Sequence, residues 1–369
     1  MSGHEPPAPA GGRESAAKPA GRRGLLRLAQ GLLVAATVAF VALALARSWD
    51  EVTAYEWTFR PEWLVASFAV FLAFYCLQAA GWWLLLAGFG LRPGVLATWA
   101  IWGSSILARY VPGTVFMFVG RAWLHHGQGL DLPRVGAAMV YEQALQLCSA
   151  LLTVALLWPL ARVEAAWAAW SLLAIPALLV LVHPRVFVPL AGRVLGLLHR
   201  EPLAAALGFG RVVGMLWYYV ATWLLVGVAA WCLARATVDA GVDALALVIA
   251  AYALAYVAGM AAFVVPSGVG VREVVLAGAL RAEVGGPVAL AWAVLLRLWQ
   301  TAIEVVFVGL VLLAERLSRG GAPSGGRPPA AGTRGAAGVV GTRVEPSRPV
   351  GPGGPGAASG SGEVDEEGR

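Results

Sequence analysis

The sequence has few charged residues and almost no lysine. Of its 369 residues, 13% are charged and 59% are apolar or aromatic, and the mean hydropathy is +0.72. A soluble domain carries about a quarter charged residues, so this composition places most of the chain in a membrane. Lys18 is the single lysine. That excludes the lysine of a phosphate-binding loop and Schiff-base chemistry within the membrane part of the chain.

Cysteine and histidine are also scarce. Cys76, Cys148 and Cys232 each lie inside an apolar run, where they are small hydrophobic residues rather than a disulfide framework or a zinc site. His125 and His126 are adjacent, so on a helix they point about 100° apart and do not converge on one metal. The arginines are scattered singly and form no basic patch of the kind that binds nucleic acid. We therefore expect no metal, no cofactor and no nucleic-acid partner, and we expect membrane lipids as the partners.

Composition shifts divide the chain into three parts. Residues 1–24 and 318–369 are rich in glycine and proline and are predicted to be disordered tails. The middle part, 25–317, is predicted to be an all-α, polytopic transmembrane helical bundle, because a helix of about 20 apolar residues crosses the hydrocarbon core. About seven to eight spans are expected from its apolar runs at 25–46, 63–89, 95–108, 135–158, 166–182, 213–234, 243–265 and 288–314.

The placement of arginine predicts the orientation, since short cytoplasmic loops carry the excess of positive charge. The basic N-terminus and the arginine-rich segment 183–212 are both expected on the cytoplasmic side. An even number of crossings must then separate them. The short run 95–108 is therefore predicted to belong to a re-entrant element near 95–121 rather than to a simple span.

Two proline-glycine interruptions fall inside apolar surroundings. One is Arg109-Tyr110-Val111-Pro112-Gly113, and the other is Pro266-Ser267-Gly268-Val269-Gly270-Val271-Arg272-Glu273. Proline removes a backbone donor and glycine permits unusual backbone angles, so a helix is expected to break at each. Broken backbone at membrane depth requires burial or a wet cavity. Two such breaks in the two halves of a chain are typical of a transport site.

Charged side chains within apolar spans are expected to face the protein interior, since each costs about 2.5 to 3.5 kcal/mol at a helix centre. We predict that they line a groove for a lipid headgroup, in which arginine binds phosphate. The alternative is that arginines and glutamates pair and hold the broken helices in place, which is favoured for Glu142. The predicted headgroup site comprises Arg109, Pro112, Gly113, Arg121, Glu142, Gln143, Pro266, Gly268, Gly270, Arg272, Glu273, Arg297 and Glu304.

With these motifs, the chain resembles the transmembrane region of the lysylphosphatidylglycerol synthase family, often called flippase-like, over roughly residues 25–315. The resemblance rests on Arg109 to Gly113 with Arg121, on Tyr141-Glu142-Gln143, and on Pro266 to Glu273, of which the last is the most specific. Ser267 departs from the glycine or proline more usual there. Longer members carry a soluble aminoacyl-transferase domain, and nothing like it follows Glu315.

The resemblance implies a lipid translocator or lipid-handling protein of the bacterial plasma membrane, without a catalytic site of its own. Its substrate is expected to be a phospholipid or a polyprenyl-phosphate-linked lipid, supplied by an enzyme encoded separately. Two alternatives stay open. One is a membrane glycosyltransferase with Asp50 and Glu51 in its first external loop, and the other is a non-transporting scaffold.

Overall fold

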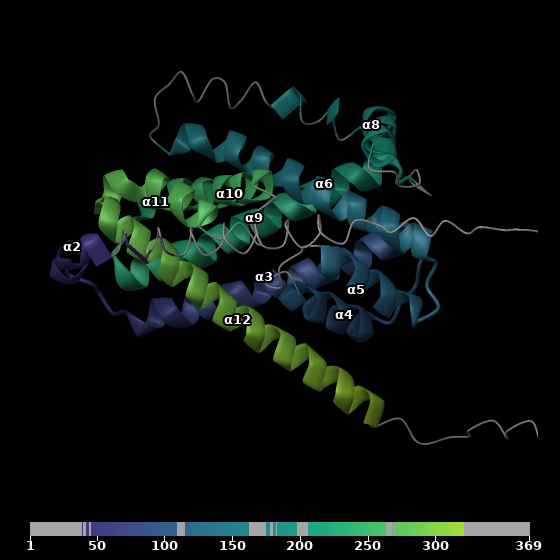
Figure 1. Ribbon diagram of the computed structural model, residues 1–369, viewed down its shortest axis with the longest axis horizontal. Helices are drawn as coiled ribbons and strands as arrows, with labels where there is room; N and C mark the ends of the chain where they lie inside the picture. Colours follow the sequence, from purple (N-terminus) through teal and green to yellow (C-terminus); the bar gives the residue numbers. More distant parts are fainter. Residues whose placement is uncertain are drawn as a thin grey trace, which may run out of the picture. The chain divides into compact units, whose positions relative to one another are not determined.

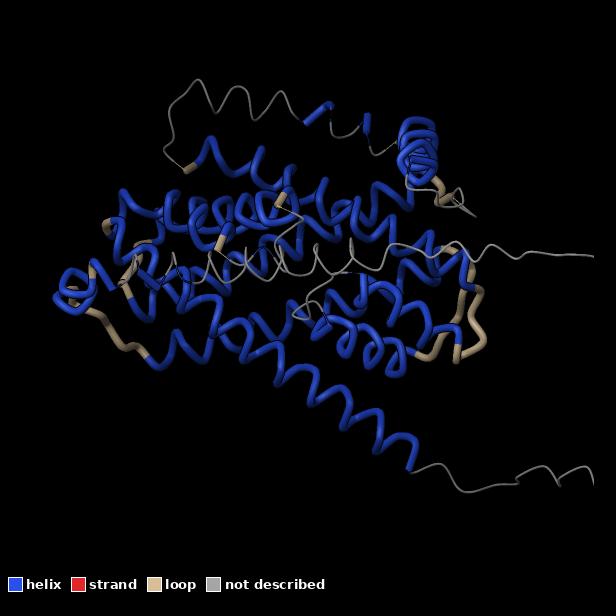
Figure 2. The backbone as a smooth tube through the Cα atoms, viewed as in Figure 1, coloured by secondary structure: helices blue, strands red, loops and turns tan. Residues whose placement is uncertain are grey.

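The computed structural model describes residues 46–108, 115–161, 183–197, 206–262 and 270–320, and in addition residues 39, 42, 43, 175–177, 180, 181 and 268. This part of the chain forms helices and loops and contains no strand (Figure 2), which confirms the all-α prediction. The helices in chain order are α2 (Trp49–Ala54), α3 (Pro61–Gly88), α4 (Val95–Leu107), α5 (Val115–His126), α6 (Leu132–Leu157), η2 (Trp158–Leu160), α8 (Pro184–Leu197), α9 (Phe209–Thr237), η3 (Val242–Ala244), α10 (Leu245–Ala261), α11 (Val271–Val284) and α12 (Gly286–Gly320).

Five helices in the described ranges are long and apolar enough to cross a membrane: α3, α6 with η2, α9, η3 with α10, and α12. Their outer faces expose large apolar side chains, such as Val65 at 68% and Leu298 at 63%. Such faces are stable in lipid rather than in water. The chain is thus a multi-pass membrane protein. The predicted runs 25–46 and 166–182 and the two tails fall largely outside the described residues, although α12 continues past the boundary predicted at 317.

The long helices α3 and α9 pack side by side and antiparallel. At one end, the backbone amides of Thr58 and Arg60 donate to the carbonyls of Thr237 and Ala236, at 3.0 and 3.2 Å. At the other end, Arg211 Nη1 donates to the carbonyl of Gly88 at 3.0 Å. The start of α3 therefore lies beside the end of α9, and the end of α3 beside the start of α9.

The two ends of the bundle carry opposite charge. One end, here called the basic end, holds the end of α3, the start of α6, α8, the start of α9 and the end of α12. Among the described residues, its charged side chains are Arg92, Arg134, Arg185, Arg193, Arg211, Arg316 and Arg319 against Asp131 and Glu315. The other, here called the acidic end, carries Asp50, Glu51, Glu56, Glu62, Asp239, Asp243 and Glu283 against Arg47, Arg60, Arg235 and Arg281. The uneven distribution of arginine along the sequence, from which orientation was predicted, thus corresponds to two opposite ends of the bundle.

Helices α4 and α5 form a hairpin whose outer ends lie at the basic end (Figure 1). α4 begins just after α3 has reached that end, and α5 finishes just before α6 begins there. Their inner ends point into the bundle, where Ile106 and Phe118 line a central cavity. With 13 and 12 residues, α4 and α5 reach about 20 Å each at 1.5 Å per residue, short of the hydrocarbon thickness.

Helices α10 and α11 form a second hairpin, which enters from the acidic end (Figure 1). α10 follows the end of α9, and Gly285 alone joins α11 to the start of α12, which then runs to the basic end. Gly259 and Met260, near the inner end of α10, line the same cavity. The order long helix, hairpin, long helix therefore occurs twice, as α3 to α6 and as α9 to α12, with the hairpins entering from opposite ends.

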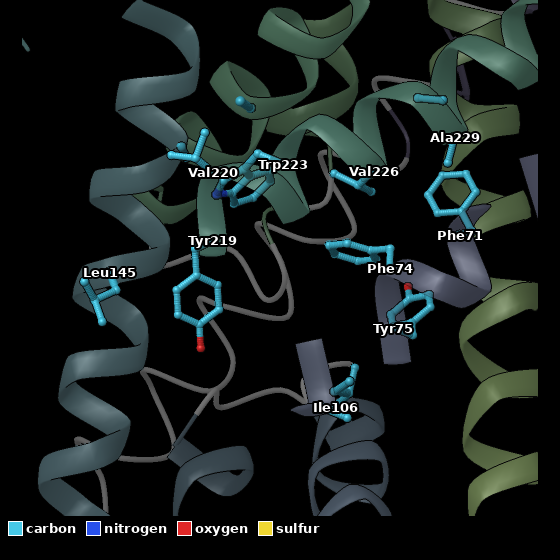
Figure 3. Close-up of a cluster of buried hydrophobic side chains, with 14 of the residues drawn as sticks. Phe71, Phe74, Tyr75, Ile106, Leu145, Tyr219, Val220, Trp223, Val226 and Ala229 are labelled. Atoms are coloured by element: carbon cyan, nitrogen blue, oxygen red, sulfur yellow. The ribbon is translucent and has the colours of Figure 1, made fainter. Parts of the chain in front are cut away.

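The apolar core lies between α3, α6 and α9. Figure 3 shows side chains of this core, among them Phe74 and Tyr75 of α3, Trp223 and Tyr219 of α9, and Leu145 of α6 beside Tyr219. α9 also packs closely on α10, because a Cβ added to Gly227 would lie 2.7 Å from Ile249 Cα. This core holds the long helices around the two hairpins and so fixes the walls of the cavity.

Candidate functional site

A cavity of about 270 Å³ lies at the inner ends of the two hairpins, between the long helices. A volume near 300 Å³ is at the lower limit for ligand sites in proteins. Its polar side chains come from α3, α5, α6, α11 and α12, and comprise Gln78, Arg121, Glu142, Gln143, Gln146, Arg272 and Gln300. These groups lie in a bundle of otherwise apolar helices, which marks the cavity as the candidate functional site.

Arg121 of α5 is the centre of a buried polar cluster. Its Nη1 lies 2.6 Å from Glu142 Oε2, and its Nε donates to Ser105 Oγ at 2.9 Å. The other carboxylate oxygen of Glu142 accepts a bond from Trp102 Nε1 at 3.1 Å. The guanidinium also lies over the ring of Trp82 at 4.9 Å. Both charged side chains are 2% exposed, so this pair links α5 to α6 and α4, as the structural alternative for Glu142 predicts.

Arg272, in the first turn of α11, is held by small and aromatic neighbours. Its guanidinium lies over the ring of Tyr256 of α10 at 4.9 Å. Its stem passes so close to Gly259 that a Cβ there would lie 2.8 Å from Arg272 Cγ. Gly268 approaches the same place, because a Cβ on it would lie 2.8 Å from Gly259 Cα. Two glycines and a tyrosine ring therefore set the position of this arginine at the cavity wall.

The glycine-rich break before α11 has the backbone that the sequence predicts. Gly268 and Gly270 have φ of 62° and 83°, in the left-handed region that favours glycine. The amide of Gly270 donates to the carboxylate of Glu273, which caps the start of the helix. Glu273 Oε1 also lies 3.9 Å from Arg297 Nε on α12. Glu273 thus stabilises both the break and the contact of α11 with α12.

A chain of hydrogen bonds joins α12 to α3 and α10 at the cavity wall. Tyr75 OH donates to Glu304 Oε2 at 3.0 Å, and Gln300 Nε2 donates to Tyr75 OH at 3.3 Å. Tyr252 OH donates to Gln300 Oε1 at 2.7 Å. Glu304 is fully buried behind Tyr75, while Tyr75, Gln300 and Tyr252 line the cavity. The polar stripe on the last helix therefore orients the aromatic wall of the site.

The structure brings most of the predicted residues to one region. Arg121, Glu142, Gln143, Gly268 and Arg272 line the cavity itself. Arg297 and Glu273 line a small adjoining cavity of about 30 Å³, which shares Arg272 and Gln300 with the larger one. Glu304 lies behind the wall, and Gly270 is the N-cap of α11. The other four predicted residues, Arg109, Pro112, Gly113 and Pro266, lie outside the described residues.

Sequence reasoning missed several residues of the wall. Gln78 is 6% exposed and is a polar residue inside the 28-residue apolar α3, a signal that could have identified it. Tyr75, Tyr252 and Tyr256 carry no comparable signal, because aromatic residues are also common in the apolar cores of helical bundles. Trp82 carries no such signal either; its side chain is fully buried and donates to His125 Nε2 at 3.0 Å.

The two residues expected to act in a glycosyltransferase do not lie at the central cavity. Asp50 and Glu51 lie exposed on the short helix α2, at the acidic end. Neither lines the central cavity or the small cavity that adjoins it. This placement gives the glycosyltransferase alternative no support.

A known family matches most of the chain. The sequence model described as the lysylphosphatidylglycerol synthase TM region matches residues 28–309. These residues include both hairpins and every residue of the cavity wall. No curated protein matches the chain at a significant level.

Proposed function

The chain belongs to the family of the lysylphosphatidylglycerol synthase transmembrane region, and from this premise we propose that it moves a phospholipid or a polyprenyl-phosphate-linked lipid between membrane leaflets. The headgroup passes through the central cavity while the acyl or prenyl chains stay in the bilayer. The membrane is the bacterial plasma membrane, and an enzyme encoded separately supplies the lipid.

The arginines of the cavity wall carry this proposal. Arg121 and Arg272 line the cavity from opposite hairpins, α4 with α5 and α10 with α11. A phosphodiester has two oxygens that match the donors of a guanidinium. The cavity therefore brings together the kind of side chain that binds a lipid phosphate.

The arrangement of the hairpins supports movement rather than binding alone. The hairpin of α4 and α5 enters from the basic end, and that of α10 and α11 from the acidic end. Both are re-entrant elements in this proposal, and their inner ends meet at the cavity. Discontinuous helices from two inverted halves are typical of transporters with alternating access. Opening of one hairpin at a time would expose the site to one leaflet and then to the other.

The orientation follows from the charged ends. The basic end is assigned to the cytoplasm, because cytoplasmic loops carry the excess of arginine. With α3 running from the acidic to the basic end, the span predicted from the sequence at 25–46 would place the N-terminus in the cytoplasm as well.

Lipid movement in vesicles tests the proposal. The purified full chain is reconstituted into phosphatidylcholine vesicles that contain a trace of fluorescent phosphatidylglycerol, and dithionite is added outside. We expect protein-containing vesicles to lose the signal of both leaflets and protein-free vesicles to lose only that of the outer leaflet. Identical loss in the two preparations, with reconstitution verified, contradicts the proposal. If a tightly bound partner enzyme co-purifies with such an inactive protein, the scaffold alternative is favoured.

A further inference from the structure

A groove separate from the central cavity opens at the basic end, between the first hairpin and the last helix. Its volume is about 580 Å³, and its walls come from α4, from α5 with the turn that follows it, and from the end of α12. Figure 1 shows the last turns of α12 standing apart from α4 and α5. None of the described residues that line this groove also lines the central cavity. The groove is therefore a second candidate site.

The walls of the groove change from apolar to polar toward the basic end. On α5, Trp123 and Leu124 come before His126, and on α12, Leu312 comes before Arg319. Both helices finish at the basic end, so the apolar part of the groove lies deeper in the membrane and the polar part lies near its surface. A phospholipid in the same leaflet has the same arrangement, with its acyl chains below a polar headgroup.

The apolar part of the groove is open to its surroundings. The side chain of Trp123 is 72% exposed, and that of Leu124 is exposed beside it. In a multi-pass membrane protein, such side chains are more stable against acyl chains than against water. Tryptophan is also enriched where a membrane meets water. The groove therefore offers a surface that a lipid of the leaflet at the basic end covers.

Helix α4 separates the groove from the central cavity. Ala100, Ile101 and Ser104 line the groove, whereas Trp102 and Ile106 line the cavity. The groove and the cavity thus lie on two sides of a single helix. A lipid in the groove is one helix away from the arginines of the candidate functional site.

The contact of α4 with α12 is closed by a glycine and an aromatic ring. A Cβ added to Gly103 would lie 3.5 Å from Phe307 Cε1 and 3.5 Å from Val308 Cγ2. The ring of Phe307 also packs against Trp102 of the cavity wall, with ring centroids 6.1 Å apart. The groups that meet at this point are apolar. Acyl chains replace such contacts at low cost, because lipid tails are about as apolar as the side chains themselves.

The first hairpin is held more firmly where it meets α6. There Arg121 of α5 forms its buried ion pair with Glu142, and Trp102 Nε1 donates to the same carboxylate. Separating a buried ion pair leaves charges without compensation in an apolar environment. The hairpin therefore opens more easily between α4 and α12 than between α5 and α6.

We infer that the groove binds a phospholipid from the leaflet at the basic end, and that its headgroup reaches the central cavity between α4 and α12, past Gly103 and Phe307. In the groove, the headgroup lies beside His126 and Arg319, and an acyl chain lies against Leu312. The passage of the headgroup rests on the proposed function, whereas the binding of lipid in the groove does not.

A disulfide between α4 and α12 tests the passage. Gly103→Cys and Val308→Cys are combined in a chain whose three native cysteines have been replaced. A Cβ at residue 103 would lie 3.9 Å from Val308 Cα, which is within reach of a disulfide. Movement of a short-chain fluorescent phosphatidylglycerol is followed by extraction with albumin, since dithionite would reduce the disulfide. We expect the oxidised protein to move no more lipid than protein-free vesicles do, and the reduced protein to match the cysteine-free chain.

The two single-cysteine variants, treated with the same oxidant, are the matched controls and are expected to keep the rate of the cysteine-free chain. Undiminished movement by the oxidised double variant, with its disulfide verified by mass spectrometry, overturns the passage and leaves the proposed function standing. If the cysteine-free chain and wild-type protein move no lipid, the proposed function fails, and photo-crosslinking decides whether the groove binds lipid.

For photo-crosslinking, benzoylphenylalanine replaces Leu312 in the groove or, as the matched control, Leu310, which is exposed on the same helix but lies outside the groove. Each protein is purified in detergent, irradiated and analysed by mass spectrometry. We expect a phospholipid adduct at residue 312 and none at residue 310, because detergent removes lipid that is not held in a site. Equal adducts at the two positions, no lipid adduct at residue 312, or an adduct there with the predicted N-terminal span at 25–46 overturns the inference.

Discussion

Arg272 and Gly259 are in direct contact across the second hairpin, so closely that a Cβ on Gly259 would lie 2.6 Å from Arg272 Nε. The contact joins α10 to the first turn of α11, and it places the guanidinium over Tyr256 and against the cavity. Only glycine leaves room for this arrangement, so the position of the Arg272 guanidinium depends on the absence of a side chain at residue 259.

Gly259→Ala is expected to displace the Arg272 side chain and slow lipid movement. The unfolding temperature should change little, because alanine favours a helix by about 1 kcal/mol over glycine and offsets part of the strain. The measurements are the dithionite assay and thermal unfolding in detergent. Gly214→Ala on α9 is the control, since a Cβ there meets no other atom within 4 Å. A wild-type rate for Gly259→Ala would show that the contact does not position Arg272.

The Arg121–Glu142 pair is expected to behave as a buried ion pair. Arg121→Met or Glu142→Leu alone leaves an uncompensated charge and should cost about 3 to 5 kcal/mol of stability. The double variant should recover much of this loss, because no charge is then left unpaired. Thermal unfolding of the four proteins measures the coupling. Strictly additive losses would mean that the two residues do not stabilise each other.

Gly227→Ala tests the packing of α9 on α10. The added Cβ would lie 2.7 Å from Ile249 Cα, and a backbone atom cannot move away as a flexible side chain can. We expect a loss of about 1 to 3 kcal/mol, typical of overpacking, measured by thermal unfolding against Gly214→Ala. Equal stability of the two variants would show that the helices are not packed this closely.

The proposal that the two hairpins are re-entrant is tested by the accessibility of single cysteines in a chain whose Cys76, Cys148 and Cys232 have been replaced. Gly94→Cys and Gly129→Cys mark the outer ends of the first hairpin, while Asp243→Cys and Glu283→Cys mark those of the second; all four positions are exposed. In intact cells, an impermeant maleimide is expected to label only the second pair. Labelling of one member of a pair without the other would mean that the hairpin crosses the membrane.

Local patterns predicted the breaks and the charged residues but not their partners. The glycines of the second interruption were identified correctly, because positive φ and helix capping depend on the residues themselves and their near neighbours. Tyr75 was missed because its partner Glu304 is 229 residues away, and the partner of Gln78 is 68 residues away. No periodicity in one helix carries information about such contacts.

Hydropathy also predicts the length of a helix better than how deeply that helix enters the membrane. The short run 95–108 was recognised as unable to span, and the structure places a 13-residue helix there. The run 243–265 is as apolar as a full span, yet α10 ends at Ala261 beside the cavity. In the proposed re-entrant arrangement, α11 returns from there to the acidic end. That return follows from the connection to α12 and not from the composition of α10.

The rate of lipid movement in Arg272→Ala tests the account most directly. Arg281→Ala is the matched control, because Arg281 lies on the same helix but is exposed at the acidic end. In phosphatidylcholine vesicles with fluorescent phosphatidylglycerol, we expect Arg272→Ala to be about tenfold or more slower than wild type, from the loss of a charge-assisted contact to phosphate. Arg281→Ala should match wild type. Equal rates for the two variants and the wild type would contradict the assignment of the cavity as the headgroup site.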